Sequence, residues 1–182
     1  MEGNSTKYQL KWSNNGSGGD GGQTKGLEIF QKIYGNNNHQ EMLIQLRDAC
    51  SKLDKIYSSA LLYCALTGLR PAEACVNMQL LKERKDDYLS KDNMILEHFR
   101  FPEFFMRRTK NAYISVMFKE LFHVIEYSNF VSYNSLRLAL RRKNIKMNIS
   151  ICRKIFATFL RSEGIETELI DLLQGRILNR FL

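Results

Sequence analysis

Apolar residues recur along most of the chain at the three-to-four-residue spacing that places them on one face of a helix. The pattern predicts helices over 27–34, 40–49, 53–66, 119–126, 133–143, 151–162 and 166–174. Gly68 is expected to end the third of these helices in a left-handed conformation, and Pro71 is placed to start another. Gly164 and Gly175 punctuate the last two helices. Arg70 is therefore predicted to lie at a sharp junction between two helices.

The middle of the chain breaks this pattern, because aromatic and β-branched residues gather there. Phe104–Arg108 and Ala112–Met117 are predicted to pair as a β-hairpin around the polar turn Thr109-Lys110-Asn111, and 93–99 is a candidate third strand. The order of elements is helices, a small sheet, then helices. The expected fold class is therefore mostly α with a small antiparallel β-sheet (α+β).

The 182 residues leave room for one globular domain and a tail. Residues 1–26 are rich in Gly, Ser and Asn and are predicted to form a flexible tail or linker. Such a composition buries too little apolar area to offset the entropy of ordering the backbone. The domain is predicted to span 27–177, and 178–182 form a short C-terminal end.

The charge balance favours a polyanionic partner, because 27 Lys and Arg against 19 Asp and Glu give a formal charge of +8. The longest apolar runs are much shorter than the roughly 20 residues of a membrane span. The four cysteines form no C-x-x-C pair and are expected to be buried, reduced thiols. Since the N-terminus carries no secretion signal, a cytoplasmic location without membrane association is expected.

Four basic residues are candidates for work on a phosphate group. Arg70 ends Thr67-Gly68-Leu69-Arg70, Lys110 lies in the predicted turn, Arg153 lies on the helix 151–162, and Arg176 follows Gly175. Cutting a DNA strand by transesterification requires a nucleophile, an acid for the leaving 5′-hydroxyl and cations around the phosphate. Arginine suits the last task because its planar fork can hold two phosphate oxygens. Arg70 and Arg153 are thus candidate phosphate ligands, and Lys110 is the candidate general acid.

Each of these residues also has an ordinary structural interpretation. Arg70 could cap a helix, Lys110 could be a solvated charge, and Arg153 could lie on the wet face of its helix. Arg176 could complement a helix dipole. The order of the four residues, and the neighbours of each, distinguish the set from a chance collection of surface charges.

From Leu53 to Ile177 the sequence resembles the catalytic domain of the tyrosine recombinases, the phage-type integrases, and most closely the integrases of archaeal fuselloviruses. Thr67-Gly68-Leu69-Arg70 with Glu73 is similar to the family's first arginine box, in which the acidic residue orients the arginine. The segment 152–159 is similar to the second arginine box, and 160–175 is similar to the helix pair that leads to the family's final His or Trp.

The resemblance implies a domain from a viral, plasmid or integrated genetic element, acting on double-stranded DNA in the host cytoplasm. Its chemistry would be integration or excision through a covalent 3′-phosphotyrosyl intermediate, with no metal and no nucleotide cofactor. Arg70, Arg153 and Arg176 would hold the scissile phosphate, Lys110 would serve the leaving group, and Glu73 would position Arg70.

The chain departs from the family pattern at three places. Ser150 stands three residues before Arg153, where the family often has His, Lys or Tyr, and Arg176 replaces the usual final histidine, as in the fusellovirus-like branch. No tyrosine follows Tyr133, although the family's nucleophile would follow Arg176. Loss of the nucleophile alone removes most of the rate, so the chain by itself is expected to be defective in cleavage. The tyrosine would come from another subunit of a homo-oligomer or from an intact integrase, and Tyr127 and Tyr133 are poor substitutes because they precede the second box.

Further basic residues are candidate contacts to the DNA backbone, which would give salt-dependent and weakly sequence-selective binding. They are Arg107, Arg108, Arg137, Arg141, Arg142, Lys143, Lys146 and Lys154. Two other functions stay open. One is a non-catalytic DNA-binding remnant that occupies attachment sites or pairs with an intact integrase, and the other is a small helical structural protein whose motif matches arise by chance.

Overall fold

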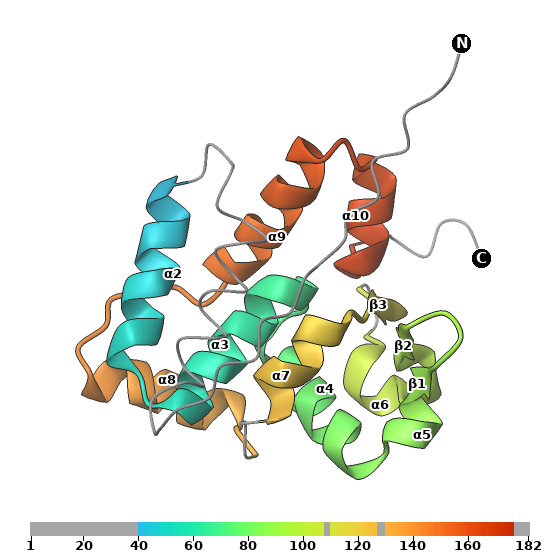
Figure 1. Cartoon of the computed structure of the whole chain (residues 1–182), viewed down its shortest axis with the longest axis horizontal. Coiled ribbons are helices and arrows are strands. Elements are labelled where there is room, and N and C mark those ends of the chain that lie inside the picture. The colour runs from blue at the N-terminus through green and yellow to red at the C-terminus, as the bar shows by residue number, and fades with distance from the viewer. Residues whose placement is uncertain (1–39, 108–109, 127–129, 177–182) are drawn as a thin grey trace, which may run out of the picture.

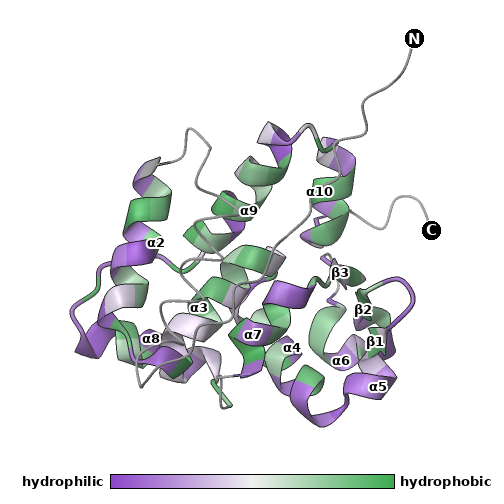
Figure 2. Cartoon of the chain, viewed as in Figure 1, coloured by the Kyte–Doolittle hydropathy of each residue, from purple (hydrophilic) through white to green (hydrophobic). Residues whose placement is uncertain are grey.

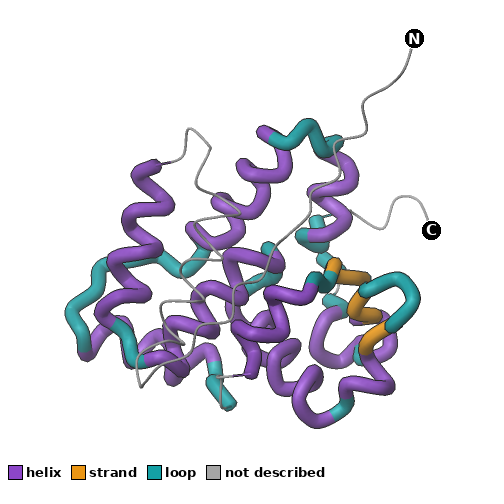
Figure 3. The backbone as a smooth tube through the Cα atoms, viewed as in Figure 1, coloured by secondary structure: helices purple, strands orange, loops and turns teal. Residues whose placement is uncertain are grey.

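The computed structural model describes residues 40–107, 110–126 and 130–176. Within these ranges the chain is mostly helical and contains one small antiparallel sheet (Figure 1, Figure 3). The predicted class, mostly α with a small antiparallel sheet, is confirmed at this level. The predicted tail 1–26, the predicted helix over 27–34 and the end 178–182 lie outside the described residues.

Helix α3 (Lys55–Thr67) is the central element of the helical body, and its residues from Ser58 to Thr67 are all buried. The helices that pack against it most extensively are α2 (Gln40–Lys52), α4 (Pro71–Glu83), α7 (Lys119–Glu126) and α9 (Ile151–Ser162). Most of α3 is hydrophobic in Figure 2, whereas the short outer helix α5 (Lys85–Tyr88) is mostly hydrophilic. The core of the domain is therefore built around α3.

The junction between α3 and α4 has the geometry expected from its sequence. Gly68 adopts the left-handed conformation with φ of 67°, and its N–H donates to the Cys64 carbonyl oxygen at 3.1 Å. Pro71 is the first residue of α4. The aromatic ring of Phe156, on α9, lies directly against Gly68 where any larger residue would place its Cβ. Glycine at this position thus serves both the backbone turn and the close approach of α9 to α3.

The sheet consists of three short antiparallel strands in the order β1-β2-β3. They are β1 (Leu89–Ser90), β2 (Ile95–Glu97) and β3 (Ile114–Val116). Leu96 pairs with Leu89 on one side and with Ser115 on the other. The candidate strand within 93–99 and the predicted strand within 112–117 are therefore confirmed, and they pair with each other.

The predicted strand Phe104–Arg108 is wrong. Its first two residues complete the helical turn α6 (Pro102–Phe105), which follows the 3-10 turn η1 (His98–Arg100). Pro102 favours this outcome because its ring presets a helical φ and it has no N–H to donate to a neighbouring strand. The helical turn also buries Phe105 completely. Lys110 consequently lies in the connection from α6 to β3 and not at the tip of a hairpin.

The remaining helices follow the predicted periodicity. They are α8 (Tyr133–Arg142), α9 and α10 (Thr167–Leu173). Gly164 and Gly175, after α9 and α10, both have positive φ angles. The four cysteines are buried and form no disulfide with one another, as expected. No helix in the described ranges has the length and apolar character needed to cross a membrane.

A buried polar chain connects the sheet to the helix before it. The two ring nitrogens of His98 hydrogen-bond with the Tyr88 hydroxyl and, at 2.8 Å, with the Ser115 hydroxyl. The His98 ring also stacks on Phe105 with a centroid separation of 4.3 Å. Burial lowers the pKa of His98 from 6.5 to about 3, because the charged ring would be removed from water. The sheet is therefore built around a neutral histidine.

Lowering the pH is expected to destabilise the protein through His98. The folded-state pKa lies below the unfolded one, so the stability that His98 provides is present above pH 6.5 and is lost as the pH falls towards 3. The free energy of unfolding, measured by urea denaturation, should fall by about 1.4 kcal/mol per pH unit below pH 6.5 from this group. His98→Gln should flatten the profile between pH 6.5 and 5, and His123→Gln, at an exposed histidine, is the matched control. Equal slopes for the wild type and His98→Gln would contradict the assignment.

Candidate phosphate-binding site

Arg70 is held at the α3–α4 junction by a buried carboxylate. Its backbone is extended and precedes Pro71, so it forms the N-cap of α4. Glu73, in the first turn of α4, is 1% exposed and accepts hydrogen bonds from the Arg70 backbone N–H at 3.2 Å and from Nη1 at 2.5 Å. The carboxylate of Glu73 therefore fixes both the backbone and the side chain of Arg70.

Arg153 comes from the first turn of α9 and is held by the end of α10. Its Nη2 donates to the backbone carbonyl oxygen of Gln174 at 2.8 Å. In return, the side-chain Nε2 of Gln174 donates to the Arg153 carbonyl oxygen at 2.7 Å. Gln174 itself is fully buried. The two residues, which lie 21 positions apart, thus bind each other reciprocally.

Gly175 lies where Arg70, Arg153 and the backbone that follows Lys110 come together. Its carbonyl oxygen accepts a hydrogen bond from Arg70 Nη2 at 3.2 Å. A Cβ on Gly175 would lie 2.8 Å from the Asn111 carbonyl oxygen and from the Ala112 nitrogen. The backbone directly after Lys110 is therefore packed against the end of α10.

Arg176 and Arg107 complete a group of cations from four parts of the chain. The Arg176 backbone N–H donates to the Asp171 carbonyl oxygen at 2.8 Å, and its Nη1 lies 3.5 Å from Asp171 Oδ1. The side chain of Arg176 is 40% exposed. Arg107, in the connection after α6, places its Nε 3.6 Å from Glu73 Oε1. Glu73 therefore contacts two of the cations at once.

The electrostatic state of Arg153 shows that the cations affect one another. Its pKa is lowered to about 10, first by burial and then by the positive charges of Arg70 and Arg176, while Glu73 opposes the shift. Nη1 of Arg153 is buried and has no hydrogen-bond partner among the described residues. A buried guanidinium nitrogen without an acceptor is unfavourable. The site is thus suited to receive an anion with several acceptor oxygens.

The connection that carries Lys110 is shaped by the buried side chain of Asn111. Asn111 Oδ1 accepts from the Arg107 backbone N–H at 2.7 Å, and its Nδ2 donates to the Tyr113 hydroxyl at 3.3 Å. Lys110 is exposed next to this buried residue. Of the sequence candidates nearby, Arg108 lies outside the described residues.

Sequence reasoning did not identify Gln174 or Asn111 as part of the site. Both are buried polar residues that hold backbone segments, and neither belongs to a pattern that the periodicity singles out. Gln174 directly precedes Gly175 and the candidate phosphate ligand Arg176, and this position next to a candidate is the one sequence signal that could have identified it. Ser150, three residues before Arg153, is exposed and precedes α9.

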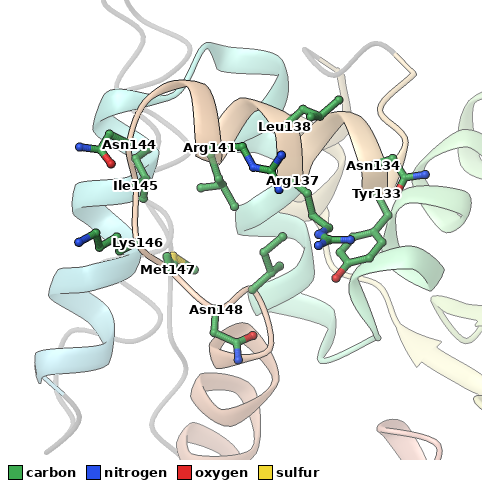
Figure 4. A pocket seen from close by; sticks show the side chains of 12 residues that line it. Tyr133, Asn134, Arg137, Leu138, Arg141, Asn144, Ile145, Lys146, Met147 and Asn148 are labelled. Atoms are coloured by element: carbon green, nitrogen blue, oxygen red, sulfur yellow. The ribbon is translucent and has the colours of Figure 1, made fainter.

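A second basic region lies on α8 and on the loop that follows it. Arg137, Arg141 and Lys146 line a cavity of about 910 Å³ together with three asparagines, Asn134, Asn144 and Asn148 (Figure 4). The Arg137 guanidinium lies 5.7 Å from the centre of the Tyr133 ring. This region combines positive charge with amide side chains, as a surface for phosphate groups does.

The other predicted DNA contacts do not line this cavity. Arg142 is exposed at the end of α8, and Lys143 places its Nζ 3.5 Å from Asp54 Oδ1. Lys154 is exposed on α9, directly after Arg153. Within the described ranges, no group of three or more His, Cys, Asp or Glu side chains is placed to hold a metal ion.

Gly175→Ala is expected to disrupt the site, and Gly164→Ala provides a matched control. Both glycines have positive φ, so alanine at either position carries a backbone strain of about 1–2 kcal/mol. Only at Gly175 would the new Cβ also collide with the backbone of Asn111 and Ala112, since nothing lies within 4 Å of a Cβ at Gly164. Urea denaturation should show a clearly larger loss of stability for Gly175→Ala, and equal losses would refute the close packing.

No protein-family model, curated protein or solved structure matches this chain. A functional interpretation therefore depends on the geometry of the arginine site, on the basic surface of α8 and on the motifs in the sequence.

Proposed function

We propose that this chain has the fold and function of a tyrosine recombinase catalytic domain, in which Arg70, Arg153 and Arg176 bind the scissile phosphate of DNA. The observation that carries the proposal is the convergence of these arginines, from the α3–α4 junction, α9 and the end of α10, with Arg153 Nη1 buried and unpaired within the described structure. Folding gathers like charges here at an electrostatic cost. A bound phosphate offsets that cost.

The arrangement fits phosphoryl chemistry better than simple ion pairing. Glu73 is the carboxylate that contacts Arg70 and Arg107, and it neutralises only part of their charge. Two guanidinium forks from different directions can hold separate oxygens of one phosphate. Such preorganised donors stabilise the additional negative charge of a transition state more than that of the ground state. In this proposal Glu73 orients Arg70 and does not react.

Lys110 serves the leaving 5′-hydroxyl in this proposal. The packing of Gly175 against Asn111 and Ala112 supports the assignment, because it brings the backbone that directly follows Lys110 beside residues 174 and 175, whose carbonyl oxygens bind the two arginines. Lys110 is exposed at the adjoining position. A flexible lysine there can swing over bound DNA and donate a proton.

The nucleophile in this proposal is a tyrosine from outside these 182 residues, in the same or another polypeptide. No tyrosine follows Tyr133 in the sequence, and Tyr133 lines the α8 cavity. The residues described therefore supply the phosphate-holding and proton-donating parts of the reaction, and the reaction takes place on DNA in the host cytoplasm.

The basic region of α8 supports a role in holding the DNA backbone away from the scissile phosphate. It also supports the second candidate function, a non-catalytic DNA-binding domain or a partner of an intact integrase, because its cavity is lined by residues other than those of the arginine site. The two functions differ in whether Arg70 and Arg153 take part in strand cleavage.

The cavity arginines are expected to contribute to DNA affinity through phosphate contacts. The double variant Arg137→Ala/Arg141→Ala should reduce the slope of log K against log salt by about 2 for a short duplex, close to one unit for each lost contact. The double variant Arg84→Ala/Lys91→Ala removes two cations that pair with Asp87 and Asp86 beside the sheet, and it should leave the slope unchanged. Fluorescence anisotropy over a range of KCl concentrations measures both. An unchanged salt slope for Arg137→Ala/Arg141→Ala would show that these two α8 arginines do not contact the DNA.

Supplying a tyrosine in trans tests the catalytic assignment. The chain is mixed with a fusellovirus-type integrase that keeps its tyrosine but lacks its own first arginine, and covalent protein–DNA adducts are measured on denaturing gels. The mixture should form adducts, and Arg70→Ala or Arg153→Ala in this chain should abolish them, because parts of one catalytic unit fail together. The wild-type chain alone should form none. Adducts that persist with Arg153→Ala would favour the non-catalytic function. Cleavage by this chain alone would contradict the proposal that the nucleophilic tyrosine comes from outside these 182 residues.

A further inference from the structure

Gln174 is the most deeply buried polar side chain in contact with the arginine site. It follows the last residue of α10 and is 0% exposed. Its side-chain Nε2 donates to the Arg153 carbonyl oxygen, and its own carbonyl oxygen accepts from Arg153 Nη2. One residue therefore holds both the backbone and the guanidinium of Arg153.

The two hydrogen bonds between Arg153 and Gln174 fix the direction of the Arg153 guanidinium group. A free arginine side chain has about 2 kcal/mol of rotamer entropy to lose when it binds a ligand. With Nη2 committed to the carbonyl oxygen of residue 174, the guanidinium plane is set, and Nη1 is left as a buried donor without a partner among the described atoms. Arg153 is thus ordered in advance of binding.

The same segment also orders a second arginine. The carbonyl oxygens of Gln174 and Gly175 are consecutive, and they accept from Arg153 Nη2 and Arg70 Nη2 respectively. The amide of Gln174 attaches this segment to the backbone of α9. Any movement of the segment would change the orientation of both guanidinium groups relative to each other.

A purely stabilising role does not account for the chemistry of Gln174. Its Oε1 is buried and has no hydrogen-bond partner in the described part of the chain. A buried amide oxygen without a partner costs about 1–3 kcal/mol. A methionine or leucine would fill the same space without this cost. The amide is therefore better explained by the position it gives to Arg153.

We propose that Gln174 is a positioning residue for phosphate binding, which orients Arg153 directly and Arg70 through the carbonyl of Gly175. This inference rests on the proposed phosphate site. In this proposal Gln174 does not touch the phosphate. Its side-chain amide holds residues 174 and 175 against α9, and the backbone carbonyl oxygens of these two residues orient the arginines.

The test measures binding of inorganic phosphate to the full chain by NMR of the arginine side-chain Nε–Hε groups. Four proteins are compared: the wild type, Gln174→Met, Arg153→Ala and the double variant. Gln174→Met should weaken phosphate binding about tenfold, which corresponds to about 1.4 kcal/mol. In the Arg153→Ala background the same substitution should have a smaller effect, because the guanidinium that residue 174 orients directly is gone and only the effect on Arg70 remains. Urea denaturation of each variant separates binding from stability.

The outcomes distinguish the two proposals. If Arg153→Ala binds phosphate as well as the wild type, the proposed phosphate site itself fails. If Arg153→Ala weakens binding but folded Gln174→Met does not, the phosphate site stands and the role of Gln174 is overturned. Equal losses from Gln174→Met with and without Arg153 would show a general structural effect and would also overturn it.

Two further measurements keep the inference testable if Gln174→Met does not fold. Gln174→Asn keeps a buried amide but is too short to reach the Arg153 carbonyl, so it should weaken binding in the same way. In the wild type, the two terminal amino groups of Arg153 should give separate resonances, because the hydrogen bond to residue 174 slows rotation of the guanidinium. Averaged resonances for Arg153 would contradict the reciprocal contact.

Discussion

The contact between Gly68 of α3 and the ring of Phe156 on α9 is the constraint on which the arginine site depends. Arg70 follows Gly68 by two positions, and Arg153 precedes Phe156 by one helical turn. The positive charge of Arg70 lowers the pKa of Arg153, so the two guanidinium groups are close enough to repel each other. The apolar packing of α3 against α9 opposes this repulsion, because separating the arginines would expose the buried side of both helices. The positive charges of Arg70 and Arg153 therefore lie beside a tightly packed contact between α3 and α9.

The end of α10 contributes backbone oxygens where another protein might use acidic side chains. Carbonyl groups at the C-terminal end of a helix lack partners within the helix and carry partial negative charge. Two consecutive carbonyls bind Arg153 and Arg70 without cancelling a full unit of charge on either. Glu73 is a buried full negative charge in contact with Arg70. The site thus keeps most of its positive potential while its side chains stay ordered.

Local signals in the sequence were sufficient for much of this arrangement and insufficient for the rest. Gly68 and Pro71 mark the α3–α4 junction, because each restricts the backbone by itself, and the helices follow from periodicity. The prediction of a strand over Phe104–Arg108 was wrong because Pro102 starts a helical turn there, although the aromatic composition of the segment is typical of a strand. The role of Gln174 depends on α9 meeting α10, and no local pattern separates such a residue from an ordinary helix end. The convergence of the arginines was expected from family resemblance and not from spacing.

The hydrogen bond between Arg70 and Gly175 joins residues that are 105 positions apart in the chain. Helices α3 and α4 have their junction signals nearby and can form while the polypeptide is still being synthesised. Arg70 cannot take its final orientation until α10 has been made and has packed against α9. The arginine site therefore forms later than the α3–α4 junction as the protein leaves the ribosome, and a nascent chain has its basic helix α8 before it has an ordered pair of arginines.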